Sequence, residues 1–318
     1  MLILRSIFKI VLFQMSLFVM PPEFTLPSFD AHSLQYMAFS KIASLPLLNS
    51  TPTHTFALSG FEYPVFQDEN TRIANSYEKF VNYCKYKWPA ITEAITVKFT
   101  CSLYTVIVDH NQRKMSMTWL DECNYNVVTK PLLAKHWGWL SRWAYNRAMR
   151  RTAEIVLLER YHTSMKEAKK LAAANAMHCI QYLSERLGEQ PYFFGNHPSA
   201  FDAYVFGYLA PIILMPQSND KLKTFINWNC PNIHTFVFRI LENYLDLPDL
   251  VKEEHYERMG RIQHDIECYK DMMAQRALNR EKYSMKNVLA FATVAVALSI
   301  ACAYYTGCVS FSSTTSGA

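Results

Sequence analysis

FFGNHPSAFDAYVFGYLAPI, residues 193–212, is the stretch that decides the fold. A polar turn opens it, and the residues from 203 to 210 are apolar on every side apart from tyrosine hydroxyls. A helix without a polar face is typical of the centre of a helical bundle. We therefore expect a buried central helix here, ended by Pro211 because proline interrupts helical hydrogen bonding.

Asp202 lies at the mouth of this apolar segment, three residues after Ser199. This is the spacing of a capping box, in which the Ser199 hydroxyl accepts from the Asp202 backbone N–H and the carboxylate accepts from the Ser199 N–H. The pair is predicted to be a structural N-cap. The alternative, a general acid or base at Asp202, is disfavoured because no His or Ser constellation stands near it in the sequence.

The chain upstream of this helix alternates short apolar runs with helical patterns. A short strand is expected at 16–20, ended by two prolines that cannot continue a central sheet. The remaining expected elements are a helix at 33–43, a strand at 45–48, a strand beginning at Val65, a short strand at Ile73 and a helix from about Ser76. This β-α-β then β-β-α order predicts an α/β thioredoxin-like domain at residues 15–88.

From residue 89 the pattern changes to helices alone. Residues 165–188 and 231–245 both carry apolar side chains at helical spacing on one face, which predicts helices that face a core. We therefore expect an all-α domain at 89–247. The charged segment 248–286 is predicted to be a helical or loosely ordered spacer.

The C-terminal run VLAFATVAVALSIACAYYTGCV, residues 288–309, contains no charged side chain. As a helix it would measure about 33 Å, enough to cross a bilayer core. Basic side chains precede it and none follows, which by the positive-inside rule keeps the bulk of the protein in the cytosol. We predict a transmembrane tail anchor at 287–309, the alternative being a buried core helix.

The N-terminal run is apolar but does not indicate export. Arg5, Lys9 and Gln14 interrupt it, and no small-residue cleavage site follows. Residues 1–14 are predicted to be a dispensable extension before a working start at Met15.

Composition excludes several classes of protein. The formal net charge of +5 over 318 residues is too mild to predict nucleic-acid binding. The eight cysteines are scattered without a CxxC pair, which favours a reducing compartment. His255, His264 and Cys268 form the one thin metal candidate, and since zinc needs four ligands in tight pairs, no metal is expected.

The motifs GNHPSAFD at 195–202 and CPNIHTF at 230–236, after a thioredoxin-like unit, resemble the glutathione transferase fold. This resemblance implies an all-α glutathione transferase C-terminal-like domain after residue 88. In that family a cis-proline precedes the third strand, and a serine about a dozen residues later opens a helix toward glutathione. Pro64 and Ser76 occupy these positions and are the weak glutathione-site candidates, although Ser76 is more readily explained as a helix cap.

A narrower resemblance is to the metaxin family, specifically the metaxin 1 type. The segments that carry it, together with 193–212 and the tail anchor, are LPSFDAHSLQYMAFSKIASLP at 26–46 and WLDECNYNVVTK at 119–130. The resemblance implies a protein on the cytosolic face of the mitochondrial outer membrane, within the sorting and assembly machinery (SAM complex). It also implies a role in protein import and β-barrel insertion, with a second metaxin and β-barrel assembly components as partners.

Catalysis is not expected. A glutathione transferase activates the thiol with a Tyr, Ser or Cys just after the first strand. Here Thr25 and Ser28 are the nearby hydroxyls, and Glu23 would oppose a thiolate by like-charge repulsion. We expect no catalytic residue and no cofactor, the alternative being a membrane-anchored glutathione-binding or glutathione transferase-like enzyme.

Aromatic and basic residues alternate at 136–151, HWGWLSRWAYNRAMRR. They predict either a partner groove or a membrane-facing surface, since Trp and Arg are favoured at interface centres. An equally good explanation is a helix with buried tryptophans and a solvated basic face.

Overall fold

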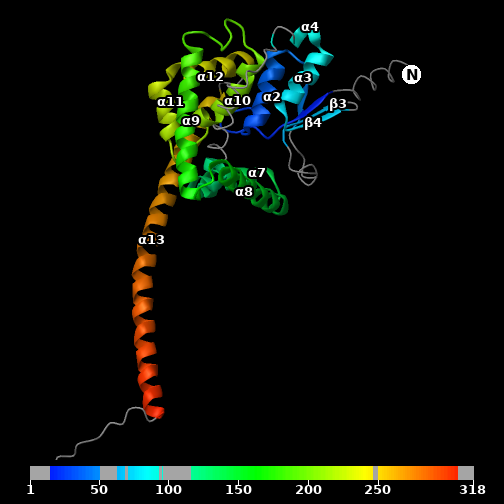
Figure 1. The fold of residues 1–318 in the computed structure, drawn as a ribbon. Coiled ribbons are helices and arrows are strands. Elements are labelled where there is room, and N and C mark those ends of the chain that lie inside the picture. The colour runs from blue at the N-terminus through cyan, green and yellow to red at the C-terminus, as the bar shows by residue number, and fades with distance from the viewer. Residues whose placement is uncertain are drawn as a thin grey trace, which may run out of the picture. The chain divides into compact units, whose positions relative to one another are not determined.

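The computed structural model describes residues 15–50, 63–68, 71–92, 95, 116–245 and 250–306 (Figure 1). The chain divides into two compact units, Met1–Ile266 and Glu267–Ala318. The predicted extension at 1–14 and the last residues of the predicted anchor, 307–309, lie outside the described residues.

The N-terminal part of the chain forms a four-stranded sheet, as the order of strands and helices along the sequence predicted. Its strands are β1 (Ser16–Phe18), β2 (Leu48–Ser50), β3 (Val65–Asp68) and β4 (Thr71–Ala74), arranged β2-β1-β3-β4. β1 pairs parallel with β2 and antiparallel with β3, and β3 pairs antiparallel with β4. This mixed sheet confirms the thioredoxin-like prediction.

The second strand begins later than the predicted 45–48. The backbone N–H of Leu45 donates to the Ser40 carbonyl at 2.8 Å, which holds Leu45 in the turn that ends the preceding helix. Leu45 is nevertheless buried. Its apolar side chain therefore belongs to the core, while its backbone is not part of the sheet.

Two helices pack against the sheet, α2 (Ala31–Ile42) and α3 (Tyr77–Lys87). Asp30 caps α2 by accepting from the Ser33 N–H at 2.7 Å. Tyr36 of α2 stacks on Phe80 of α3 with their ring centroids 4.3 Å apart. These aromatic contacts fix the two helices together above the strands.

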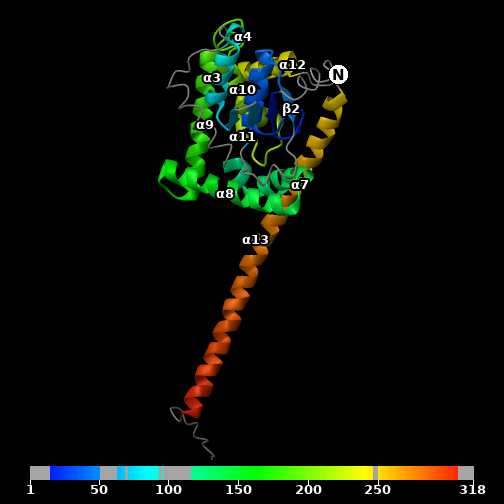
Figure 2. The same cartoon turned by 90° about the vertical axis from the view of Figure 1, so that its right-hand side faces the viewer.

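The described elements of the first unit from residue 89 onward are helical, in agreement with the helical pattern of the sequence there (Figures 1 and 2). Its described elements are α4 (Pro89–Thr92), η2 (Ser116–Leu120), α6 (Glu122–Asn124), η3 (Tyr125–Thr129), α7 (Lys130–His136), α8 (Trp139–Tyr161), α9 (Met165–Leu187), α10 (Ala200–Leu214), α11 (Lys221–Asn229), α12 (Pro231–Tyr244) and the start of α13 (Leu250–Tyr305). Every residue of α10 is buried. The all-apolar segment is therefore the central helix, as expected.

The prediction that Pro211 ends this helix is wrong. α10 continues to Leu214, and the Met215 N–H still donates to the Pro211 carbonyl at 3.0 Å. A proline so close to the end removes one donor, and the residues after it can still donate to carbonyls one turn earlier. The helix therefore tolerates Pro211 in its last turn.

α2 and α10 pack closely and join the two parts of the fold (Figure 1). Gly207 makes this approach possible, because a Cβ built there would stand 2.5 Å from the Ala31 carbonyl oxygen. Gln35 of α2 donates from Nε2 to the Tyr204 carbonyl at 3.1 Å, and Tyr77 donates from its hydroxyl to the Ala200 carbonyl at 2.7 Å. Helix and sheet domains thus share one core.

α13 runs through the predicted spacer. Its first part belongs to the folded body, where fully buried Ile266 packs in a cluster with Phe24, Val128 and Leu132. The predicted spacer at 248–286 is therefore only partly a spacer. Within the second unit, the helical stretch Lys286–Ala303 is long and apolar enough to cross a membrane, and none of it is buried.

Candidate functional site

The segment after β1 is where a transferase would place its thiol-activating hydroxyl. Here it forms a tight turn, in which Glu23 and Leu26 exchange both backbone hydrogen bonds at 3.1 and 3.0 Å. The two residues between them, Phe24 and Thr25, have φ of 56° and 61°. Residues other than glycine rarely adopt this left-handed region of φ. Contacts with the surrounding residues, rather than the backbone preference of Phe24 and Thr25, therefore hold the turn.

The side chain of Glu23 helps to stabilise this turn. Its side chain is 1 % exposed and binds three cationic or ionisable groups. Lys135 Nζ lies 2.5 Å from Oε1 and His136 Nε2 lies 3.3 Å from the same oxygen. Arg258 donates from Nη1 to Oε2, and its guanidinium lies over the Phe24 ring, 5.2 Å from the centroid.

This cluster, the Glu23 clamp, joins three parts of the chain: the turn after β1, the end of α7 and the start of α13. Burial by itself would raise the pKa of Glu23. The hydrogen bonds and positive charges of Lys135 and Arg258 outweigh burial and hold that pKa below its usual value. The carboxylate therefore stays charged and paired at neutral pH.

The Glu23 clamp weakens the repulsion that the sequence predicted between Glu23 and a thiolate. Because Lys135 and Arg258 neutralise Glu23, like-charge repulsion is weaker than the sequence suggested. The nearby hydroxyls are engaged instead: Thr25 donates to the Phe24 carbonyl at 2.6 Å, and fully buried Ser28 accepts from the Asp30 N–H at 3.2 Å. Both hydroxyls therefore already take part in hydrogen bonds within the protein.

Pro64 and Ser76 lie close together. The Tyr63–Pro64 peptide bond is cis, and the Asn75 N–H donates to the Pro64 carbonyl at 2.9 Å. Ser76 stands at the N-cap position of α3, yet its side chain makes no capping hydrogen bond. Its backbone N–H donates to the Tyr36 hydroxyl at 2.9 Å, so this donor is already engaged by the protein.

Ser199 and Asp202 form a capping box at the start of α10. The Asp202 carboxylate is fully buried and accepts from the Ser199 N–H at 2.8 Å, the Ser199 hydroxyl at 2.5 Å and the Phe193 N–H at 2.9 Å. Burial raises the pKa of Asp202, while these hydrogen bonds oppose the rise. A carboxylate so enclosed contacts no solvent and has no route to a substrate.

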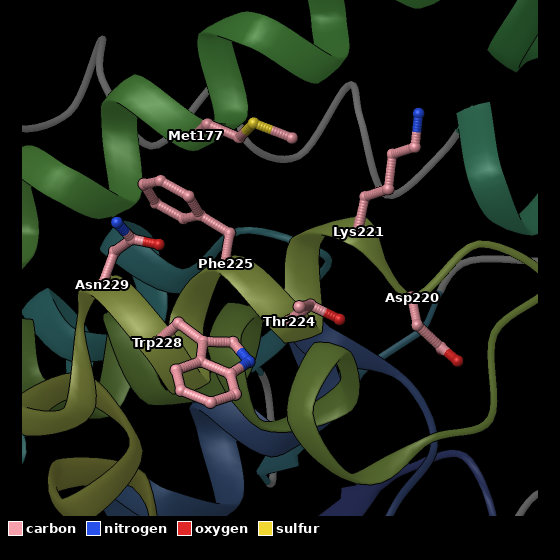
Figure 3. Close-up of a pocket in the computed structure, with 7 residues that line it drawn as sticks. All are labelled: Met177, Asp220, Lys221, Thr224, Phe225, Trp228 and Asn229. Carbon is pink, nitrogen blue, oxygen red and sulfur yellow. The ribbon is translucent and has the colours of Figure 1, made fainter.

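A hollow lies elsewhere, on α9 and α11 (Figure 3). It has a volume of about 490 Å³ and is open to solvent. Its lining residues are Met177, Asp220, Lys221, Thr224, Phe225, Trp228 and Asn229. Figure 3 shows the Asp220 and Lys221 side chains pointing away from each other, so they form no acid–base pair.

The metal candidate finds no support in the described side chains. Among them, no group of three His, Cys, Asp or Glu residues could hold a metal ion. His264 and Cys268 lie one helical turn apart on α13, and the side chain of His255 is outside the described set.

Comparisons with known proteins bear on this arrangement. The family described as "Glutathione S-transferase, C-terminal domain" matches residues 176–240, which include α10 and most of α12. A "Metaxin-1 homolog" of Caenorhabditis briggsae is 28 % identical and covers 94 % of this chain and 98 % of its own. This chain is similar to the metaxins along nearly its whole length.

Other metaxins are also similar to this chain. "Metaxin-3" of Danio rerio is 26 % identical over 76 % of this chain and 79 % of its own, and human "Metaxin-2" is 24 % identical over 70 % and 86 %. A glutathione S-transferase of Ceriporiopsis subvermispora, solved with glutathione, is 13 % identical with a TM-score of 0.48 and covers 74 % of this chain and 99 % of its own. The metaxins among these proteins confirm the metaxin resemblance, and the family match at residues 176–240 confirms the glutathione transferase-like fold.

The Glu23 clamp gives a first prediction. Replacing Lys135 and Arg258 together by glutamine leaves the buried Glu23 carboxylate with only the His136 ring beside it, so the free energy of unfolding at pH 7 should fall by about 2 kcal/mol. This is less than the 3–5 kcal/mol typical of fully buried pairs, because the two cationic side chains are 55 % and 38 % exposed and partly screened. Urea unfolding of the full chain in detergent, followed by tryptophan fluorescence, measures the loss.

Adding Glu23→Gln to the same double variant is the control. The amide needs no counter-charge, so most of the lost stability should return. The pH dependence has a definite sign: a lowered pKa means that the clamp stabilises above pH 4.5 and that this contribution disappears as pH falls through the folded-state pKa. A triple variant no more stable than the double would show that burial of an unpaired charge is not the cause.

Proposed function

We propose that this protein is a non-catalytic, tail-anchored subunit of the mitochondrial outer-membrane sorting and assembly machinery. Similarity to metaxins along nearly the whole chain is the observation that carries the proposal. In this role the body faces the cytosol and supports protein import and β-barrel insertion. Its partners are a second metaxin and components of the β-barrel assembly machinery.

The apolar end of α13 supports the membrane attachment. Its mean hydropathy is 1.8 over Lys286–Ala303, and no part of that stretch is buried in protein. A core helix of a soluble protein would be mostly buried. The exposed apolar side chains require another apolar environment, which a bilayer supplies.

The turn after β1 supports a non-catalytic body. The Glu23 clamp and the Phe24 ring occupy the position of a thiol-activating hydroxyl, and the Ser76 N–H is bound by Tyr36. The runner-up, a membrane-anchored glutathione-using enzyme, rests on Pro64 and on Ser76 at the start of α3. Calorimetric titration with glutathione separates the two: binding together with turnover of a thiol acceptor would favour the enzyme.

Truncation tests the anchor. A chain ending at Lys286 keeps the folded body and loses the apolar helix, so it should move entirely from the mitochondrial membrane fraction to the soluble fraction. The full chain should resist carbonate extraction, and protease added to intact mitochondria should digest its body. Copurification of the full chain with β-barrel assembly components tests the assignment to that machinery, and absence of the full chain from mitochondria would overturn it.

A further inference from the structure

α8 turns two tryptophans away from the core. Tyr145, Ala153 and Leu157 lie on its buried side. Trp139 and Trp143 are 74 % and 60 % exposed. Trp143 and Tyr145 are two positions apart, which on a helix is a rotation of about 200°, so Trp143 leaves α8 on the side opposite buried Tyr145.

The outward ridge of α8 is defined by Trp139, Trp143, Arg147 and Arg151, each four residues from the next. Consecutive members of such a row are neighbours on a helix surface. Leu140, 53 % exposed, lies beside the ridge. The structure separates the tryptophans of 136–151 into two groups. Trp137 is buried, with 5 % of its surface exposed, whereas the two tryptophans of α8 are exposed.

The ridge is strongly positive. Residues 139–151 contain four arginines and no acidic residue. Arg150 lies over the Tyr125 ring, with its guanidinium carbon 4.6 Å from the centroid. In the described part of the chain, no carboxylate pairs with Arg142, Arg147 or Arg151, so their charges remain available to an external anion.

This combination matches one kind of partner. Tryptophan rings favour the level of lipid headgroups, and a helix with aromatic and basic side chains on its outer face is typical of one lying in a membrane interface. Near an anionic lipid surface each arginine favours contact by about fivefold. A protein groove fits less well, because it would have to supply several unpaired carboxylates around two tryptophans.

We propose that the outward ridge of α8 is a second membrane contact, which docks on anionic phospholipid headgroups of the bilayer entered by the C-terminal helix. The proposal rests on the membrane attachment proposed above. The helical stretch 267–285 is about 28 Å long, a short tether that keeps the local headgroup concentration high. A headgroup affinity too weak to hold a free protein is then sufficient.

Tryptophan quenching in vesicles tests this contact with the full chain. The protein is reconstituted in phosphatidylcholine vesicles with or without about one-fifth anionic phospholipid, with bromine on the acyl chains as quencher. Quenching should be greater in the anionic vesicles, and the double variant Trp139→Ser, Trp143→Ser should abolish this increase. Arg147→Gln and Arg151→Gln should each weaken the contact by about fivefold.

Trp228→Ser is the matched control. Trp228 is 82 % exposed on α11, and its removal should leave the increase intact. Equal loss in this control, or equal quenching in neutral and anionic vesicles, overturns the α8 contact. Shielding from acrylamide that rises with protein concentration without vesicles would assign the ridge to a second copy and also overturn it.

Carbonate extraction of the same vesicles distinguishes the two proposals. Retention of every variant shows that the anchor holds, whatever the quenching. If the wild-type chain is extracted, the anchor fails. The excess of tryptophan quenching in anionic over neutral vesicles then decides the α8 contact by itself: its presence supports the contact, and its absence overturns it.

Discussion

Gly207→Ala is expected to lower the free energy of unfolding by about 3 kcal/mol, a large share of what holds a typical domain together. The added Cβ would stand 2.4 Å from Gln35 Cγ, 2.5 Å from the Ala31 carbonyl oxygen and 2.9 Å from the Gln35 backbone nitrogen. Two of these three atoms belong to the α2 backbone, which cannot rotate away as a side chain can. α2 would have to move off α10, and this would also strain the hydrogen bond from Gln35 to the Tyr204 carbonyl.

Gly260→Ala makes the same chemical change without the contact. Gly260 lies inside α13, and no atom stands within 4 Å of the position that an added Cβ would take. Alanine should therefore stabilise that helix by up to about 1 kcal/mol through its better helix propensity. Urea unfolding of both variants beside the wild type measures two shifts of opposite sign, and a Gly207→Ala variant as stable as the wild type would show that α2 and α10 are not closely packed.

Much of the fold follows from local patterns. Short apolar runs beside prolines predicted the strands, and helical spacing predicted the amphipathic helices. The glycine at 207 interrupts an otherwise bulky apolar helix, which is a signal of close backbone approach that the sequence carries. Pro211 misled the prediction, because a proline's effect depends on how near it stands to the helix end.

The candidate site was less predictable. Glu23 was recognised, but its partners Lys135 and Arg258 are 112 and 235 residues away. Nothing in the local sequence of α13 indicates that its first turns return to the end of β1. Periodicity reports which side of a helix is apolar and does not report which distant charge lies against it. The separation of buried Trp137 from the two exposed tryptophans of α8 has the same cause, because only the packing decides it.

The Ser199–Asp202 box was visible because both partners are three residues apart. Its third donor, the Phe193 N–H, lies nine residues before Asp202 and became visible only in the fold. This extra bond turns an ordinary cap into a junction between the turn at 193–199 and α10.

Asp202→Ala is expected to destabilise the protein by about 4 kcal/mol, because it leaves the buried Phe193 and Ser199 N–H groups and the Ser199 hydroxyl without an acceptor. An ordinary exposed cap contributes only about 1 kcal/mol. Asp202→Asn keeps the shape and one acceptor oxygen, so it should cost less, about 2 kcal/mol. Urea unfolding of the full chain in detergent measures both variants.

Asp220→Ala is the matched control, because exposed Asp220 stands at the N-cap of α11 without a side-chain capping bond and should change stability by less than about 0.5 kcal/mol. The pH dependence gives an independent check on the Asp202 site. Since burial raises the folded-state pKa of Asp202, its contribution is fully present below pH 3.8 and declines as pH rises through that folded-state pKa. The cost of Asp202→Asn should therefore be larger near pH 4 than at pH 7, and a cost that instead grows toward neutral pH would mean that the three donors outweigh burial.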